Sequence, residues 1–320
     1  MDLSSYNPLP PGGLHFDGGA GDDLLRLVGT TRTDTLSVNG SQLMLGPTTI
    51  TWTNATAELH PATATLIELG SLSFAAGTLS LPGSGGAVLR VGLLDPGVSG
   101  VLDLQDNGLI VSATADARDA VLAQVCQWIR SARGNSAAWT GPGLTSTNAR
   151  DNPATTLAAV INDKGPAAGP ILTKFNGADV TDDDILVKYT WNGDATLDGV
   201  VNADDYFLID AGFIMRRTGF RNGDFNYDGV INADDYFLID SAFLQQTGLL
   251  CAETSPPASP PEHIANSPAA APLPESLTRP GNESAFAHAD AHTPAPPDDP
   301  WQTDDDLLLE SRPDLEGIFV

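Results

Sequence analysis

The sequence predicts a multidomain chain that is mainly β in its first part and helical in a small module that follows. Short runs of Leu, Val, Ile and Thr, separated by Gly, Asn, Asp and Pro, fill residues 14–190 and indicate strands. Two acidic loops, each followed by an apolar pattern of helical period, mark residues 191–250. Residues 251–320 are rich in Pro, Ala and acidic side chains, a composition typical of disordered segments. Residues 1–13 are also expected to be disordered.

The β-rich region is expected to form either a β-solenoid or a β-sandwich. Its strand patterns recur at intervals of about ten residues, and apolar and polar residues alternate at Thr35–Val38 and at Thr78–Leu81. The low aromatic content, 7%, and the frequent glycines favour the solenoid.

One glycine-rich motif in this region is a candidate metal site. Gly18–Arg26 reads GGAGDDLLR and matches the calcium-binding nonapeptide of parallel β-rolls. Calcium in that architecture lies between successive turns, and residues 30–38 repeat only the D-x-L part of the motif. Asp23 is therefore a weak candidate ligand, and a glycine-rich turn between strands is the alternative.

A helical pattern at about residues 116–133 interrupts the strands. Four apolar residues share one face of this predicted helix: Val121, Val125, Trp128 and Ile129. Asp116 is the expected N-cap and Gly134 the expected stop. We expect the helix to cover an open end or edge of the strand array, which limits edge-to-edge pairing.

Two loops with one pattern, D-x-[TN]-x-D-G-x-[VI]-N-x-D-D, begin thirty residues apart at Asp194 and Asp224. Calcium binds six to eight oxygens, and a twelve-residue loop supplies them from positions 1, 3, 5, 7, 9 and 12. In the first loop these positions are Asp194, Thr196, Asp198, the carbonyl of Val200, Asn202 and Asp205. In the second loop they are Asp224, Asn226, Asp228, the carbonyl of Val230, Asn232 and Asp235.

Position 6 of each loop must turn sharply around the ion, and it is occupied by Gly199 and Gly229. The sequence therefore predicts two calcium ions. The first site is expected to be the weaker one, because Thr196 offers a neutral hydroxyl where Asn226 offers a carbonyl-type oxygen.

Each loop leads directly into a helix with two apolar stripes. The first stripe should close each helix against its mate: Tyr206, Ile209 and Phe213, with Tyr236, Ile239 and Phe243. The second stripe is a candidate partner-binding surface: Phe207, Asp210, Ala211 and Ile214, with Phe237, Asp240, Ser241 and Leu244. The alternative for this second stripe is packing against the preceding domain.

The paired loop-and-helix units resemble the type I dockerin module. Residues 185–191, ILVKYTW, read as a strand and not as the first helix of a complete EF-hand, and the resemblance covers about 55 of the 320 residues. It implies a small helical module that folds around two calcium ions and docks onto a cohesin-like or other protein partner. Loop positions 10 and 11 read Ala-Asp in both copies, where dockerins of cellulase assemblies carry small hydroxyl residues, so the resemblance leaves the partner open.

Composition excludes some classes of partner. The net charge is −26, from 41 acidic and 15 basic residues, which argues against nucleic-acid binding. No apolar stretch approaches the roughly 18 residues of a transmembrane helix, so membrane insertion is not expected. The order of segments is similar to the C-terminal part of large exported bacterial surface proteins. We therefore expect an extracellular or cell-surface protein whose export signal belongs to a longer product.

Catalysis is not expected within this chain. It contains no G-x-S-x-G elbow, H-E-x-x-H pair or Walker loop. The alternative function is the C-terminal part of an exported polysaccharide-degrading glycoside hydrolase, because such enzymes need only two carboxylates. Glu58 and Glu68 are the glutamates of the β-rich region. Whether that region binds polysaccharide, and whether Cys126 and Cys251 form a disulfide or remain two thiols, stays open.

Overall fold

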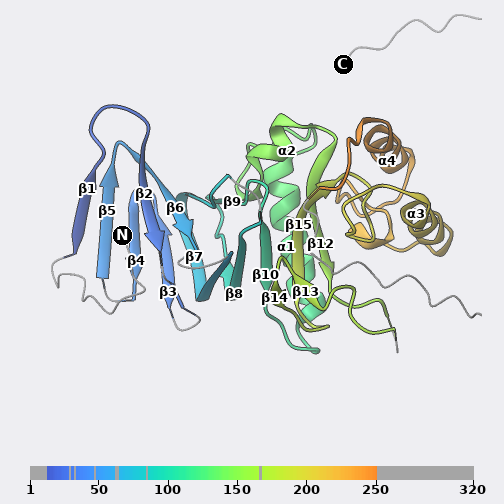
Figure 1. The fold of residues 1–320 in the computed structure, drawn as a ribbon, viewed down its shortest axis with the longest axis horizontal. Helices are drawn as coiled ribbons and strands as arrows, with labels where there is room; N and C mark the ends of the chain where they lie inside the picture. Colours follow the sequence, from blue (N-terminus) through green and yellow to red (C-terminus); the bar gives the residue numbers. More distant parts are fainter. Residues whose placement is uncertain are drawn as a thin grey trace, which may run out of the picture. The chain divides into compact units, whose positions relative to one another are not determined.

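The structure is a computed structural model, and it describes residues 13–28, 30–31, 34–46, 48–61, 65–83, 86–165 and 168–250. The expected disordered segments, and with them Cys251, lie outside these residues except for Gly13. The described chain is mainly β in its first part and helical at its end (Figure 1).

Ten strands precede the first helix: β1 (Leu14–Asp17), β2 (Asp23–Val28), β3 (Thr35–Asn39), β4 (Gln42–Leu45), β5 (Thr48–Thr53), β6 (Ala55–His60), β7 (Leu66–Ser80), β8 (Val88–Asp95), β9 (Gly100–Asp103) and β10 (Gly108–Val111). Two rows of parallel strands run through this region. One row contains β7, β8 and β10, and the other contains β2, β6, β7, β9 and β11 (Gly143–Thr145). The long strand β7 belongs to both rows, because its first half pairs with β8 and its last residues pair with β9.

This pairing shows that the chain winds in successive turns, with each strand stacked in parallel on the equivalent strand of the turn before it. Leu66 pairs with Val88, and Val88 pairs with Gly108, so each turn of the coil takes about 20 residues. Strands β3, β4 and β5 depart from it as an antiparallel meander. The parallel stacking of successive turns corresponds to the solenoid alternative, since the sheets of a β-sandwich are antiparallel.

The predicted covering helix is α1 (Arg118–Arg133). Gly134 ends it with a positive φ of 62° and donates its N–H to the Arg130 carbonyl, as expected. The prediction of an Asp116 cap is wrong: the N-cap is Ala117, and no side chain caps the first turn. Hydrogen bonds from the Ala117 and Arg118 amides to the Thr114 carbonyl form a backbone turn that starts the helix instead.

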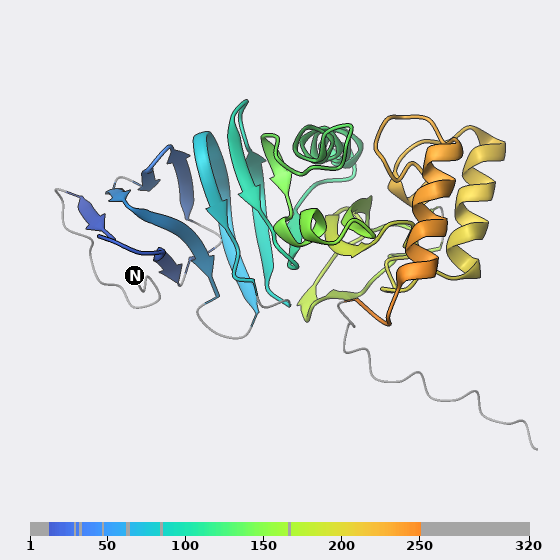
Figure 2. The same ribbon diagram turned by 90° about the horizontal axis from the view of Figure 1, so that it is seen from above.

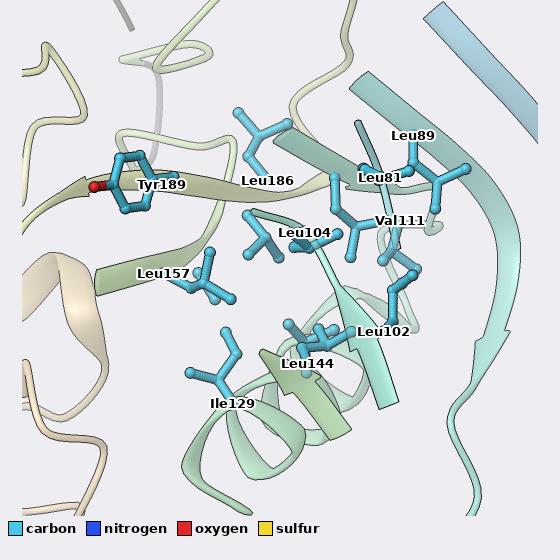
Figure 3. Close-up of a cluster of buried hydrophobic side chains, with 14 of the residues drawn as sticks. Leu81, Leu89, Leu102, Leu104, Val111, Ile129, Leu144, Leu157, Leu186 and Tyr189 are labelled. Carbon is cyan, nitrogen blue, oxygen red and sulfur yellow. The ribbon is translucent and has the colours of Figure 1, made fainter. Parts of the chain in front are cut away.

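One hydrophobic core joins α1 to the ends of the strand rows. The second half of the β region adds α2 (Thr147–Asp151), β12 (Thr155–Ile161), β13 (Lys174–Phe175), β14 (Ala178–Asp179) and β15 (Ile185–Trp191). Strands β15 and β12 extend the row of β10 with antiparallel pairing. Figure 3 shows Ile129 of α1 directed toward Leu144 of β11 and Leu157 of β12, and all three are buried. Helix α1 thus covers the space where the last strands of both rows end.

The C-terminal module consists of α3 (Ala203–Met215), the short 3-10 helix η1 (Phe220–Asn222) and α4 (Ala233–Gln245). Helices α3 and α4 lie side by side in both views (Figures 1 and 2). Ile209 and Ile239 are fully buried, and Tyr206 packs edge-on against Phe243 as Phe213 does against Tyr236. The interpretation of this stripe as the helix–helix contact is confirmed.

Candidate metal centre

The first loop gathers three carboxylates at one point. Asp194, Asp198 and Asp205 can each place one oxygen within 4.8 Å of the others, and Asp194 and Asp205 are fully buried. Carboxylate oxygens brought together at this spacing are the ligands that a hard divalent cation prefers. Loop positions 1, 5 and 12, which the sequence singled out, therefore lie together in the fold.

Backbone amides hold these carboxylates in place. The Asp194 carboxylate accepts from the Asp198 amide at 3.1 Å and from the Gly199 amide at 2.9 Å. The Asp205 carboxylate accepts from the Thr196 amide at 2.9 Å and from its hydroxyl at 3.0 Å. Gly199 has a φ of 90°, which favours glycine at this turn.

Burial sets the electrostatics of the site. Burial, with a smaller contribution from the neighbouring carboxylates of Asp205 and Asp198, raises the pKa of Asp194 to about 6. The Thr190 hydroxyl, which donates a hydrogen bond to Asp194, and the cation of Lys188 act in the opposite direction. A bound divalent cation would supply more of the positive charge that this buried carboxylate lacks.

The last ligand of each loop also starts the following helix. The Asn202 side chain accepts from the Asp204 amide at 2.8 Å, while the Asp205 carboxylate accepts from the Asn202 amide at 2.9 Å. Asn232 and Asp235 form the same capping box in the second loop. The geometry around each predicted ion is therefore tied to the first turn of α3 or α4.

The second loop has a different internal network. Asp224 accepts from the Gly219 and Gly229 amides, both at 3.3 Å, and Asp235 accepts from the Phe225 and Asn226 amides. Burial raises the pKa of Asp235, while these amide bonds lower it. Among the described residues, the compact group of three carboxylates is found in the first loop and not in the second.

The remaining predicted ligands lie around these carboxylates. Asn226 and Asp228 bind each other through two hydrogen bonds, of 2.8 and 3.1 Å. The amides of Val200 and Val230 both donate to the Asp at loop position 5, at 3.0 and 2.8 Å. These bonds hold the backbone at position 7, whose carbonyl is the expected ligand, close to the carboxylate at position 5.

The residues of the partner-binding stripe predicted from the sequence differ in their exposure to solvent. Phe207 and Phe237 are each 70% exposed, and Ile214 and Leu244 are more exposed still. Ala211 and Ser241 are half-buried.

The two aspartates of that stripe have partners inside the module. Asp240 accepts from the Tyr206 hydroxyl and Asp210 from the Tyr236 hydroxyl, both at 2.6 Å. Each tyrosine directly follows a position-12 ligand in the first part of its helix, so each helix is bonded to the opposite one close to its own loop. The interaction helps to raise the pKa of Tyr236 to about 12, although burial is the larger cause. Sequence periodicity placed Asp210 and Asp240 on the outer stripe but could not identify these crossed bonds.

Tyr227 anchors the second loop to the β region, and sequence reasoning missed it. Its hydroxyl donates to the Leu157 carbonyl at 2.6 Å and accepts from the Ala159 amide at 2.9 Å. Both groups belong to β12, the last strand of its row. The aromatic side chain at loop position 4, where the first loop has Leu197, was the available signal.

The first loop is anchored differently. The buried Lys188 of β15 donates from Nζ to the Leu197 carbonyl at 2.6 Å. Asn192 adds bonds to the carbonyls of Ala154 and Pro153, both at 2.8 Å. These contacts, together with those of Tyr227, show that the module packs against the β region.

The other candidate residues lie apart from the loops. Asp23 begins β2, and one of its oxygens is buried without a hydrogen-bond partner in the described chain. Neighbouring Asp17 accepts from the Gly19 amide and from Asn54, as in a glycine-rich turn. Burial raises the pKa of the partly buried Cys126 thiol to about 12.

No protein-family model, curated protein or solved structure matched this chain. In the described part of the chain, every helix is too short or too polar to cross a lipid bilayer.

Glu58, one of the two glutamates of the β region, is engaged by Arg26 at 3.3 Å and by His60 at 2.9 Å.

Proposed function

We propose that residues 191–250 form a dockerin-like module that binds two calcium ions and docks onto a protein partner. In this proposal, the β-rich region is a non-catalytic body that carries the module in an extracellular or cell-surface assembly. The observation that carries the proposal is the pair of twelve-residue loops, each ending in a buried Asp that both faces the loop and caps a helix.

The buried carboxylates support calcium as the ligand. Asp194, Asp205 and Asp235 are fully buried, and Asp224 is nearly so. Burying an anion without a counter-charge is unfavourable. Hard oxygen ligands with no Cys or His among them favour calcium over a softer metal.

The exposed helix surfaces support docking. Phe207 and Phe237 occupy equivalent positions thirty residues apart and have the same exposure, 70%. Large aromatic side chains at such positions are typical anchors of protein interfaces. Because the two helices repeat one sequence, either could present its phenylalanine to the same pocket of a partner.

A capture experiment tests the docking function. The full-length protein, immobilised, would be exposed to the extracellular and cell-surface fractions of its source cells, with calcium or with EGTA. We expect a specific protein to be retained in calcium, and to be lost with EGTA and with the Phe207→Ser/Phe237→Ser double variant. A matched control is Leu24→Ser/Met44→Ser, which alters exposed apolar residues of the β region. Retention of the same proteins by the Phe207/Phe237 variant would contradict the proposal.

A further inference from the structure

A groove of about 620 Å³ lies beside the second loop, where α3 ends. We call it the α3-end groove. Six of the residues that line it are Phe213, Ile214, Arg216, Arg217, Val230 and Ile231. Phe213, Ile214 and Val230 are between 55% and 77% exposed, which leaves an apolar surface open beside two exposed arginines.

The corresponding place beside the first loop is filled by the chain itself. Gln246, which follows α4, exchanges two hydrogen bonds of 2.8 Å with the backbone N–H and carbonyl of Val201. The Leu250 amide then donates to the Gly199 carbonyl at 3.0 Å. A Cβ added to Gly199 would lie only 2.5 Å from the Leu250 carbonyl oxygen, so this segment covers the loop closely.

The two places differ because the chain leaves the two helices in different directions. Gln246 is extended, with φ −61° and ψ 133°, and continues along the first loop. Arg216, its counterpart thirty residues earlier, is left-handed, with φ 52° and ψ 44°, and turns the chain away. Within the described residues, no hydrogen bond reaches the backbone of Ile231 or the carbonyl of Gly229, the counterparts of Val201 and Gly199.

We propose that the α3-end groove binds an extended peptide segment of a partner protein, one that carries an acidic residue next to aliphatic residues. The free backbone groups of Gly229 and Ile231 would bind the peptide as their counterparts bind Gln246–Leu250. Arg216 and Arg217 would bind its carboxylate, and exposed Arg side chains are suited to this. The apolar rim would cover its aliphatic side chain.

The groove is also continuous with the proposed docking face, because Ile214 belongs to the outer stripe of α3. A partner seated on Phe207 could therefore place an extended segment in the groove. The inference goes beyond the proposed function and does not require it: the peptide site is formed by the end of α3 and the second loop, not by the phenylalanines.

Fluorescence anisotropy on the full chain tests this site with two labelled hexapeptides. The acidic probe is Gln-Asp-Gly-Leu-Leu-Asp, which follows the pattern of residues 246–250, and the basic probe has Lys in place of both Asp. We expect saturable binding of the acidic probe in the range of about 10–100 μM, and at least tenfold weaker binding of the basic probe.

The double variant Arg216→Glu/Arg217→Glu should weaken binding of the acidic probe at least tenfold. The charge-matched control Arg150→Glu/Lys174→Glu changes two exposed basic residues of the β region and should leave it within twofold. The Phe207→Ser/Phe237→Ser variant should also bind the probe normally, which separates this site from the docking face. Absence of saturable binding, or equal binding by the Arg216/Arg217 variant and its control, would overturn the inference.

Discussion

The two loops of the module share one twelve-residue pattern, but the fold uses them differently. The first loop lies against β15 through Lys188 and is covered by Gln246–Leu250. The second loop reaches the end strand β12 through Tyr227 and is open beside Arg216. The comparison teaches that a repeated ligand pattern fixes the loop and the start of its helix, whereas the residues between and after the ligands decide what each loop contacts.

The largest effect on stability is expected when the anchor of the second loop is removed. Tyr227→Phe removes a hydroxyl that satisfies two buried backbone groups of β12, and each unpaired group costs about 1–3 kcal/mol. We expect the free energy of unfolding to fall by roughly 2 kcal/mol or more, measured by guanidinium denaturation of the calcium-saturated protein. The end strand would also lose part of its cover, which favours aggregation. An effect below about 0.5 kcal/mol would show that the anchor does not stabilise the fold.

A smaller effect should be confined to the first loop. Gln246→Ala removes both hydrogen bonds to Val201, and we expect about tenfold weaker calcium binding at that loop alone, equivalent to about 1.4 kcal/mol. Calcium titration by calorimetry measures this. The matched control is Gln245→Ala, whose side chain donates only to the Ser241 carbonyl on the surface of α4. Equal losses in both variants would contradict the role assigned to Gln246.

The two crossed Tyr–Asp bonds should contribute equally to the stability of the module. Tyr206→Phe and Tyr236→Phe each remove one 2.6 Å bond to a carboxylate on the opposite helix. Because Asp210 and Asp240 are exposed, we expect each variant to lose only about 0.5 kcal/mol of stability. Thermal unfolding of both variants would test the symmetry, and a clear difference between them would show that only one of the bonds matters.

The smallest effect concerns loop position 3. Thr196→Asn gives the first loop the carbonyl-type ligand of the second and should tighten its calcium binding by about twofold, about 0.4 kcal/mol. Asn226→Thr should weaken the second site by a similar factor. If neither exchange changes the affinities measured by calorimetry, the expectation that the first site is weaker for this reason is wrong.

Local chemistry explains which parts could be predicted from the sequence. The loops, the capping boxes and the stripes of α3 and α4 depend on residues within one or two turns of each other. The parallel pairing of Leu66, Val88 and Gly108 joins residues about 20 positions apart, and no local pattern separates it from a sandwich. The anchor of Tyr227 on Leu157 joins loops and strands still further apart. The cap of α1 was missed because a backbone turn at Thr114 replaced the expected Asp116 side chain.

Calcium titration by calorimetry, with the wild type and the Asp194→Ala and Asp224→Ala variants, tests the central claim most directly. We predict two binding events in the wild type with a gain of helical circular dichroism, and one event in each variant. Addition of a chelator should remove the bound calcium and reverse the gain of helical circular dichroism. If the wild type bound no calcium, or if either variant still bound two ions, the assignment of the two loops as calcium sites would be contradicted.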